Sequence, residues 1–237
     1  MKNIDIKIGK KIIGKGHPVF IIAEAGANHN GDFDLAIKMI KEAKKTGADC
    51  IKFQTFTAEE FCVDKDKMFS YFSRGKKVTE SEFEMFKRHE FSESQWKSIM
   101  KTCDNENIMF LTTIQDPINL KMMKKLGLKA IKVGSDDFDH IVNLNIYSKS
   151  GLPIILSKGM SDLNETKYII NKIKNNFKNR LAILHCVSLY PSNPEYLNLN
   201  QITTLKNLFP DIVWGFSDHS QSTISSSIAV ALGASII

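Results

Sequence analysis

The chain has 237 residues, of which 43% are hydrophobic and 24% are charged, and its formal net charge is +6. These proportions are ordinary for a globular domain, and no apolar run approaches the roughly 18–20 residues that cross a bilayer, so a membrane-spanning chain is excluded. The lysines are spread over predicted helices, and no helix-turn-helix or RNA-binding motif accompanies them. We therefore expect no nucleic-acid partner.

Residues 1–17 come before the main pattern and predict a β-hairpin, because isoleucines alternate with polar residues on both sides of Gly9. The segment is basic but lacks the apolar region of a secretory signal peptide. The four cysteines lie far apart and include no Cys-x-x-Cys pair. We therefore expect a cytoplasmic protein with reduced thiols, no disulfide framework and no cysteine zinc site.

From residue 19 onward, short apolar strands alternate with helices whose starts carry capping residues, such as Ser92 with Gln95 and Asp116 before Pro117. Strands are predicted at residues 19–22, 50–54, 109–113, 130–134, 154–157, 181–186 and 212–216, and residues 235–237 begin an eighth strand that is truncated. This alternation predicts one domain over residues 1–237, an α/β (β/α)₈ TIM barrel. An open doubly wound sheet is the alternative, weakened because no Gly-x-Gly-x-x-Gly motif opens a helix.

The connection over residues 55–91 is far longer than a usual loop and is rich in aromatic residues. Residues 79–82 suggest a short helix inside it. Two interpretations stay open, a lid-like loop at the catalytic edge and an insertion packed on the barrel.

Polar side chains follow every predicted strand, at the edge of the barrel where ligands bind. Lysines with several hydroxyls suit a phosphate, and histidine with carboxylates suits a divalent metal or proton transfer. The residues alone therefore predict a barrel enzyme for an anionic metabolite. In chain order, these side chains are Glu24, Asn28, His29, Lys52, Gln54, Thr112, Thr113, Lys132, Ser135, Asp136, Asp137, Ser157, Lys158, His185, Ser188, Tyr190, Ser217, Asp218 and His219.

Seven short motifs occur in a specific order, at residues 22–31, 52–55, 132–135, 156–160, 184–188, 190–191 and 215–219. In this order they resemble the N-acetylneuraminate (sialic acid) synthase family, which includes legionaminate and pseudaminate synthases. The resemblance implies a TIM barrel that condenses phosphoenolpyruvate with an N-acetylated amino-sugar aldehyde, such as N-acetylmannosamine or a diacetamido hexose, and water. The products are a nonulosonic acid and phosphate, and a divalent metal, Mn²⁺, assists.

The same resemblance implies roles for individual residues. Glu24, Asp137 and His219 are the implied catalytic residues, and His219 is also one of two metal ligands. Phosphoenolpyruvate-binding residues would be Lys52, Thr113, Lys132, Ser135, Ser188 and Ser217, and sugar-binding residues would be Asn28, Gln54 and Tyr190. It further implies a homodimer of the full-length protein and a C-terminal antifreeze-like domain that is absent from this chain.

Two positions depart from the pattern of the resemblance. Asp137 stands where glutamate is common, and Lys158 stands where a small residue such as threonine is usual. Both leave the acceptor sugar open. A Schiff-base aldolase that uses Lys52, Lys132 or Lys158 is one alternative. A barrel that binds a sugar or phosphate without catalysis is another.

Overall fold

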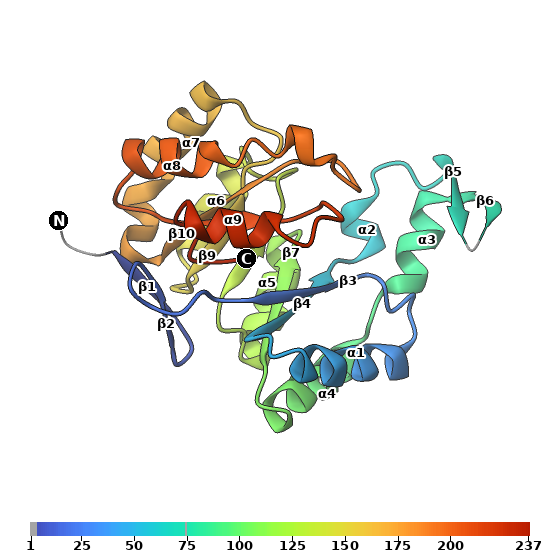
Figure 1. Cartoon of the computed structure of the whole chain (residues 1–237). Coiled ribbons are helices and arrows are strands. Elements are labelled where there is room, and N and C mark those ends of the chain that lie inside the picture. The colour runs from blue at the N-terminus through green and yellow to red at the C-terminus, as the bar shows by residue number, and fades with distance from the viewer. Residues whose placement is uncertain (1–3, 74) are drawn as a thin grey trace.

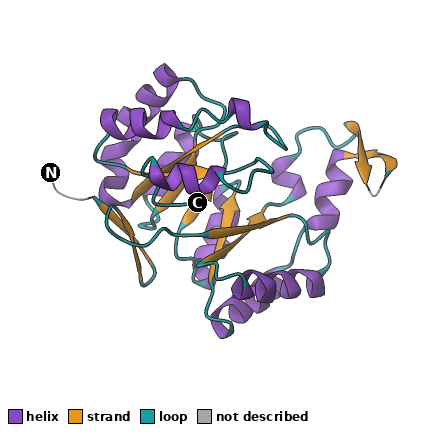
Figure 2. Ribbon diagram, viewed as in Figure 1, coloured by secondary structure: helices purple, strands orange, loops and turns teal. Residues whose placement is uncertain are grey.

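A computed structural model describes residues 4–73 and 75–237. Its centre is a sheet of parallel strands that curls as in a barrel, with helices on the outer face (Figure 1, Figure 2). The strands lie side by side in chain order, as β3 (Ile22–Gly26), β4 (Cys50–Thr55), β7 (Met109–Ile114), β8 (Ile131–Val133), β9 (Ile154–Ser157), β10 (Leu181–Cys186) and β11 (Val213–Ser217). The predicted α/β class with a parallel sheet is thus confirmed. The order never reverses as it does in a doubly wound sheet, so that alternative is not favoured.

Three of the helices that cover the sheet begin directly after capping residues that the sequence shows. Ser92 with Gln95 and Asp162 with Glu165 form capping boxes, and Asp116 caps the helix that starts at Pro117. The outer helices are α1 (Phe33–Lys45), α4 (Glu93–Asn105), α5 (Pro117–Leu126), α6 (Ile141–Ser148), α7 (Leu163–Phe177), α8 (Asn200–Leu208) and α9 (Ser225–Ala231). Two 3₁₀ turns, η1 (Lys178–Arg180) and η2 (Pro194–Tyr196), lie between them.

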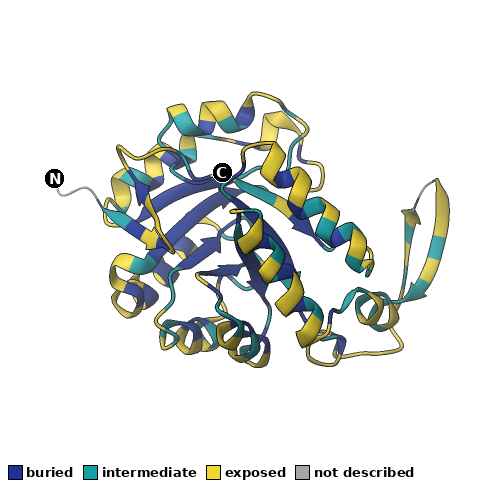
Figure 3. Ribbon diagram, turned by 90° about the horizontal axis from the view of Figure 1, so that it is seen from below, coloured by how far each residue is buried: buried dark blue, intermediate teal, exposed yellow. Residues whose placement is uncertain are grey.

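The core lies between the strands and these helices, and the strands are buried along most of their length (Figure 3). Trp96, Ile99, Met123 and Ile170 pack from the helices against outward-facing strand residues such as Phe53. Strands covered on both faces read as continuous apolar runs. That is why a lysine within such a run needs a functional explanation.

The N-terminal residues form an antiparallel pair of strands, β1 (Asp5–Ile8) and β2 (Lys11–Gly14). Ile6, Ile8 and Ile13 are buried, and they join a cluster with residues that open the barrel strands, such as Ala182 and Val213. The hairpin therefore covers the amino ends of the strands, opposite the edge that carries the polar residues.

Residues 235–237 lie between the two edges of the curled sheet. The amide of Phe216 donates to the carbonyl oxygen of Ile236 at 2.8 Å, and the amide of Ile22 donates to the carbonyl oxygen of Ile237 at 2.8 Å. A parallel bridge also joins Phe20 to Ile236. These three residues therefore connect β11 to the segment that leads into β3.

The long connection contains α2 (Ala58–Phe61), β5 (Met68–Ser73), β6 (Lys76–Ser81) and α3 (Glu82–His89). The β5–β6 hairpin projects away from the curled sheet (Figure 1). The short helix suggested at residues 79–82 starts only at Glu82, because the preceding residues pair with β5. Within residues 4–73 and 75–237, none of the helices is both long and apolar enough for a membrane crossing.

Candidate active site

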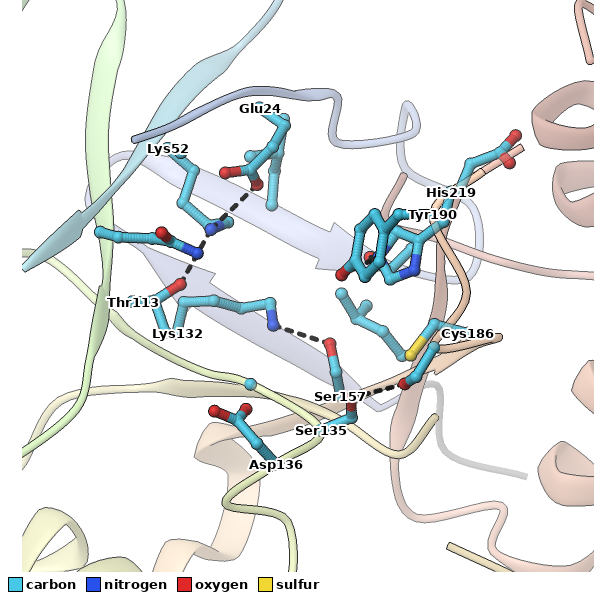
Figure 4. Close-up of a pocket in the computed structure, with 18 of the residues that line it drawn as sticks. Glu24, Lys52, Thr113, Lys132, Ser135, Asp136, Ser157, Cys186, Tyr190 and His219 are labelled. Atoms are coloured by element: carbon cyan, nitrogen blue, oxygen red, sulfur yellow. Dashed lines mark hydrogen bonds and ion pairs between the residues drawn. The ribbon is translucent and has the colours of Figure 1, made fainter. Parts of the chain in front are cut away.

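A cavity of about 690 Å³ opens at the carboxyl ends of the strands (Figure 4). It brings together every residue to which the resemblance assigns a role, except Asp137: Glu24, Asn28, Lys52, Gln54, Thr113, Lys132, Ser135, Ser188, Tyr190, Ser217 and His219. No residue of the 55–91 connection is among its described lining residues, so the lid role of that segment stays a prediction.

Lys52 lies at the centre of one wall, on β4 between β3 and β7. The parallel register places it beside Glu24, and its Nζ lies 2.9 Å from Glu24 Oε2. The same ammonium donates to Thr113 Oγ1 at 2.8 Å. Lys52 is buried while the Glu24 carboxylate is half exposed. The lysine therefore forms the inner side of this charge pair, and the carboxylate forms its solvent-facing side.

Lys132 lies on β8 in the same cavity and has different partners. Its Nζ donates to Ser157 Oγ and to the carbonyl oxygen of Val133, both at 2.7 Å. Within the described chain, its ammonium makes no ion pair with a carboxylate, although the residue is only 6% exposed. Burial, and then the charge of Lys52, lower the pKa of Lys132 to about 8. A buried cation with neutral partners is costly, and an anion in the cavity would compensate it.

Hydroxyl groups complete the cavity around the two lysines. Ser135 Oγ and Ser188 Oγ lie 2.8 Å apart, and Ser157 and Thr113 contact the ammonium groups directly (Figure 4). Ammonium groups and hydroxyls at these distances form a donor set for the oxygens of a phosphate or carboxylate.

His219 follows β11 and is held by a backbone contact. Its Nδ1 lies 2.7 Å from the carbonyl oxygen of Val187, so Nδ1 carries the proton and donates. Burial lowers the pKa of His219, which favours the neutral ring. Nε2 then carries a lone pair that can accept, and it lies 3.1 Å from the hydroxyl of Tyr190 and 3.2 Å from that of Ser217.

Among the residues with a role implied by the resemblance, only Asp137 does not line the cavity, and its neighbour Asp136 does (Figure 4). The reason is the turn after β8, where the Asp136 carboxylate folds back over Gly134 so closely that a Cβ there would overlap it. Asp137 is half-buried outside the cavity, and burial followed by the charge of Asp136 raises its pKa. Asp137 therefore does not line the cavity in this structure, and its catalytic role stays a prediction.

The alternation of side chains along a strand explains why some polar residues face the cavity and others do not. On β10, Leu184 and Cys186 line it, whereas His185 points outward and lies 2.7 Å through Nε2 from the carbonyl oxygen of Leu197. Lys158 is also outside, with its Nζ 3.3 Å from Gln201 Oε1. His29 stacks on Phe91, with ring centroids 4.4 Å apart.

Several further residues line the cavity although the resemblance assigns them no role: Gln115, Ser157, Met160, Cys186 and Asp218. Ser157 and Asp218 were visible as polar residues at strand ends, and counting alternate positions along β10 from Leu184 would have found Cys186. Gln115 and Met160 lie in loops past β7 and β9, where no periodicity indicates direction.

A divalent metal fits one part of this site. An imidazole whose Nδ1 is anchored on a carbonyl oxygen and whose Nε2 faces a cavity has the orientation of a metal ligand. No group of three His, Cys, Asp or Glu residues within ligand geometry occurs among residues 4–73 and 75–237. His219 is therefore a suitable single ligand, and the carboxylates of Glu24, Asp136 and Asp218 line the same cavity.

Comparison with known proteins places the chain in a family. The model of the NeuB family matches residues 39–237. The chain belongs to the NeuB family. Its relatives include the N,N'-diacetyllegionaminic acid synthase of Legionella pneumophila, 34% identical over 97% of this chain and 65% of the relative. The human N-acetylneuraminate-9-phosphate synthase is 37% identical over 95% of this chain and 62% of the relative.

Among solved structures, the N-acetylneuraminic acid synthetase of Leptospira borgpetersenii, crystallised with citrate, is similar to this NeuB-family chain. The TM-score is 0.86 and the identity 36%, covering 99% of this chain and 77% of that one. The chain spans less than two thirds of the length of its curated NeuB-family relatives, 65% and 62% for the two named above.

Proposed function

We propose that this chain is the catalytic barrel of a phosphoenolpyruvate-dependent synthase. It would join phosphoenolpyruvate to an N-acetylated amino-sugar aldehyde and water, and release a nonulosonic acid and phosphate. Family membership supports the reaction class. The observation that carries the proposal is Lys132, a buried ammonium that faces the cavity with neutral partners alone.

The two anionic groups of phosphoenolpyruvate suit the two lysines. Lys132 with Ser135, Ser157 and Ser188 would bind one of them, and Lys52 with Thr113 would bind the other. Each charge-assisted hydrogen bond contributes about 1.5–3 kcal/mol. Because the lysines come from the separate strands β4 and β8, the enol would be fixed at both ends.

The acceptor sugar would lie beside Glu24, Asn28, Gln54 and Tyr190, all of which line the cavity. The new bond forms between C3 of the enol and the aldehyde carbon, and the aldehyde oxygen becomes the hydroxyl. Water adds at C2, and the C–O bond to phosphate at that carbon then breaks. The Glu24 carboxylate, held in place by Lys52, is suited to accept hydrogen bonds from sugar hydroxyls.

We also propose a divalent cation, Mn²⁺, at His219 Nε2, with carboxylates of Glu24 or Asp136 as oxygen ligands. When bound, it would supply Lewis-acid polarisation of a carbonyl oxygen. The homodimer and the antifreeze-like domain stay predictions from the resemblance, and the cytoplasmic location stays a prediction from the N-terminal segment and the cysteine pattern.

A product assay tests the function. The chain is incubated with Mn²⁺, phosphoenolpyruvate and either N-acetylmannosamine or a diacetamido-trideoxyhexose, and phosphate and sugar acid are quantified together. We expect one phosphate per nonulosonic acid. Borohydride trapping of pyruvate on a lysine would instead support the Schiff-base aldolase. Phosphoenolpyruvate binding without turnover of any acceptor would support a non-catalytic barrel.

A further inference from the structure

The lone pair of His219 Nε2 is already engaged in the ligand-free protein. Nδ1 must donate to the carbonyl oxygen of Val187, 2.7 Å away, because a carbonyl only accepts. Nε2 therefore accepts, and two hydroxyls lie within reach, that of Tyr190 at 3.1 Å and that of Ser217 at 3.2 Å.

The Tyr190 ring also covers the imidazole. The two rings are stacked, with centroids 4.1 Å apart and an angle of 26° between their planes (Figure 4). The two residues whose hydroxyls lie near Nε2, Tyr190 and Ser217, differ in how freely their side chains can move. Ser217 is the last residue of β11 and is half-buried, whereas Tyr190 is in a loop and is 78% exposed. Exposed side chains change rotamer within nanoseconds, so Tyr190 is the partner that can leave.

We propose that Tyr190 is a gate on His219, closed by the hydroxyl that occupies Nε2 and opened when the ring swings into solvent. The inference rests on the proposed cation site, because the ligand that the gate excludes is a divalent cation. A cation and the tyrosine hydroxyl compete for one lone pair, so each binds more weakly in the presence of the other. Removing the hydroxyl removes this competition while leaving the stacked ring.

The first measurement is acylation by diethyl pyrocarbonate, which attacks an imidazole nitrogen through its lone pair. The rate at His219 is followed by peptide mass spectrometry in the full chain, with the exposed His140 as an internal reference. Because a hydrogen bond contributes about 0.5–1.5 kcal/mol net, we expect Tyr190→Phe to raise the rate at His219 about two- to tenfold. Tyr196→Phe is the matched control, since Tyr196 is an exposed tyrosine in the following turn η2.

The second measurement is the affinity for Mn²⁺ alone, by titration with electron paramagnetic resonance. We expect tighter binding in Tyr190→Phe by a similar factor, and no change in Tyr196→Phe. A rate at His219 equal to that of the Tyr196→Phe control would overturn the proposal, and so would weaker Mn²⁺ binding in Tyr190→Phe. Neither measurement contains phosphoenolpyruvate or a sugar, so a failed synthase assay would count against the proposed function alone.

Discussion

Lys132 and Lys158 are both buried lysines whose ammonium groups contact neutral atoms, but only Lys132 faces the cavity. Burial lowers the pKa of both. We expect Lys132→Ala to weaken phosphoenolpyruvate binding about tenfold or more, because it removes a charge-assisted hydrogen bond of about 1.5–3 kcal/mol. Lys158→Ala, the matched control, should bind within about twofold of the native chain. Isothermal titration measures both, and equal losses would mean that the anion lies elsewhere.

At the same scale, strand periodicity accounts for what the sequence could and could not predict. Side chains alternate between the two faces of a strand, so Lys52 and Gln54, two residues apart, are expected on one face, and both line the cavity. Asp137 lies beyond the end of β8, where side chains no longer alternate between two faces. In the turn that follows the strand, Asp136 lines the cavity and Asp137 does not. Hydrogen-bond pairs such as Tyr190 with His219 join loops far apart in the sequence, and no local pattern encodes them.

The β3–α1 loop is an element whose stability should depend on pH. His29 is buried against Phe91, and its Nδ1 accepts from the amide of Gly31 at 3.1 Å. Burial, and then His89, lower the pKa of His29 to about 4 from 6.5. A depressed pKa means that the unfolded chain binds the proton first, so stability is retained above pH 6.5 and lost as the pH falls towards 4.

His29→Phe tests this loop, because phenylalanine keeps the stack on Phe91 and cannot be protonated. The native chain should lose roughly 3 kcal/mol more unfolding free energy between pH 7 and 4 than the variant, at about 1.4 kcal/mol per pKa unit. Urea unfolding at a series of pH values gives the difference. Parallel pH profiles would show that His29 does not titrate in this range.

In the long connection between β4 and α4, the sequence did not predict where the helices and strands begin and end. Capping residues located the helix starts at Ser92, Asp116 and Asp162. The aromatic residues of 55–91 gave no such boundary, because they follow no regular alternation along β5, where Tyr71 and Phe72 are adjacent. Cross-strand pairing joins β5 to β6, and the Arg88–Glu80 ion pair, at 2.7 Å, joins this hairpin to α3.

Replacing residues 68–79 by a short Gly-Ser linker should leave phosphoenolpyruvate binding unchanged. None of these residues is among the described lining of the cavity, and the hairpin projects from the curled sheet (Figure 1). Projecting loops tolerate shortening when little of the core depends on them. Calorimetric titration with phosphoenolpyruvate checks this, with thermal unfolding as the control for folding. A large loss of affinity in a folded variant would instead show that the hairpin closes over the anion.

At the scale of the molecule, the first and last strands of a curled sheet carry unpaired backbone groups unless another segment joins them. Ile236 makes this connection, since its carbonyl oxygen accepts from Phe216, it bridges to Phe20, and its side chain is fully buried. The side chain packs in the cluster that also holds the N-terminal hairpin, through Ile6 and Ile13. Ile236 therefore contacts both edges of the sheet and shares a buried cluster with the β1–β2 hairpin that covers the amino ends of the strands.

Ile236→Ala should consequently destabilise the whole barrel. Removing a buried isoleucine side chain costs about 2–5 kcal/mol, because the transfer free energy is lost and a cavity remains. Ile12→Ala is the control, since Ile12 is 49% exposed on β2 and should change stability by less than about 0.5 kcal/mol. Urea unfolding followed by tryptophan fluorescence is a suitable measurement, because Trp214 lies on β11, the strand that Ile236 joins. Suppose that Ile236→Ala loses little unfolding free energy and that the dependence of this free energy on urea concentration is unchanged. The two edges of the sheet would then hold together without this contact.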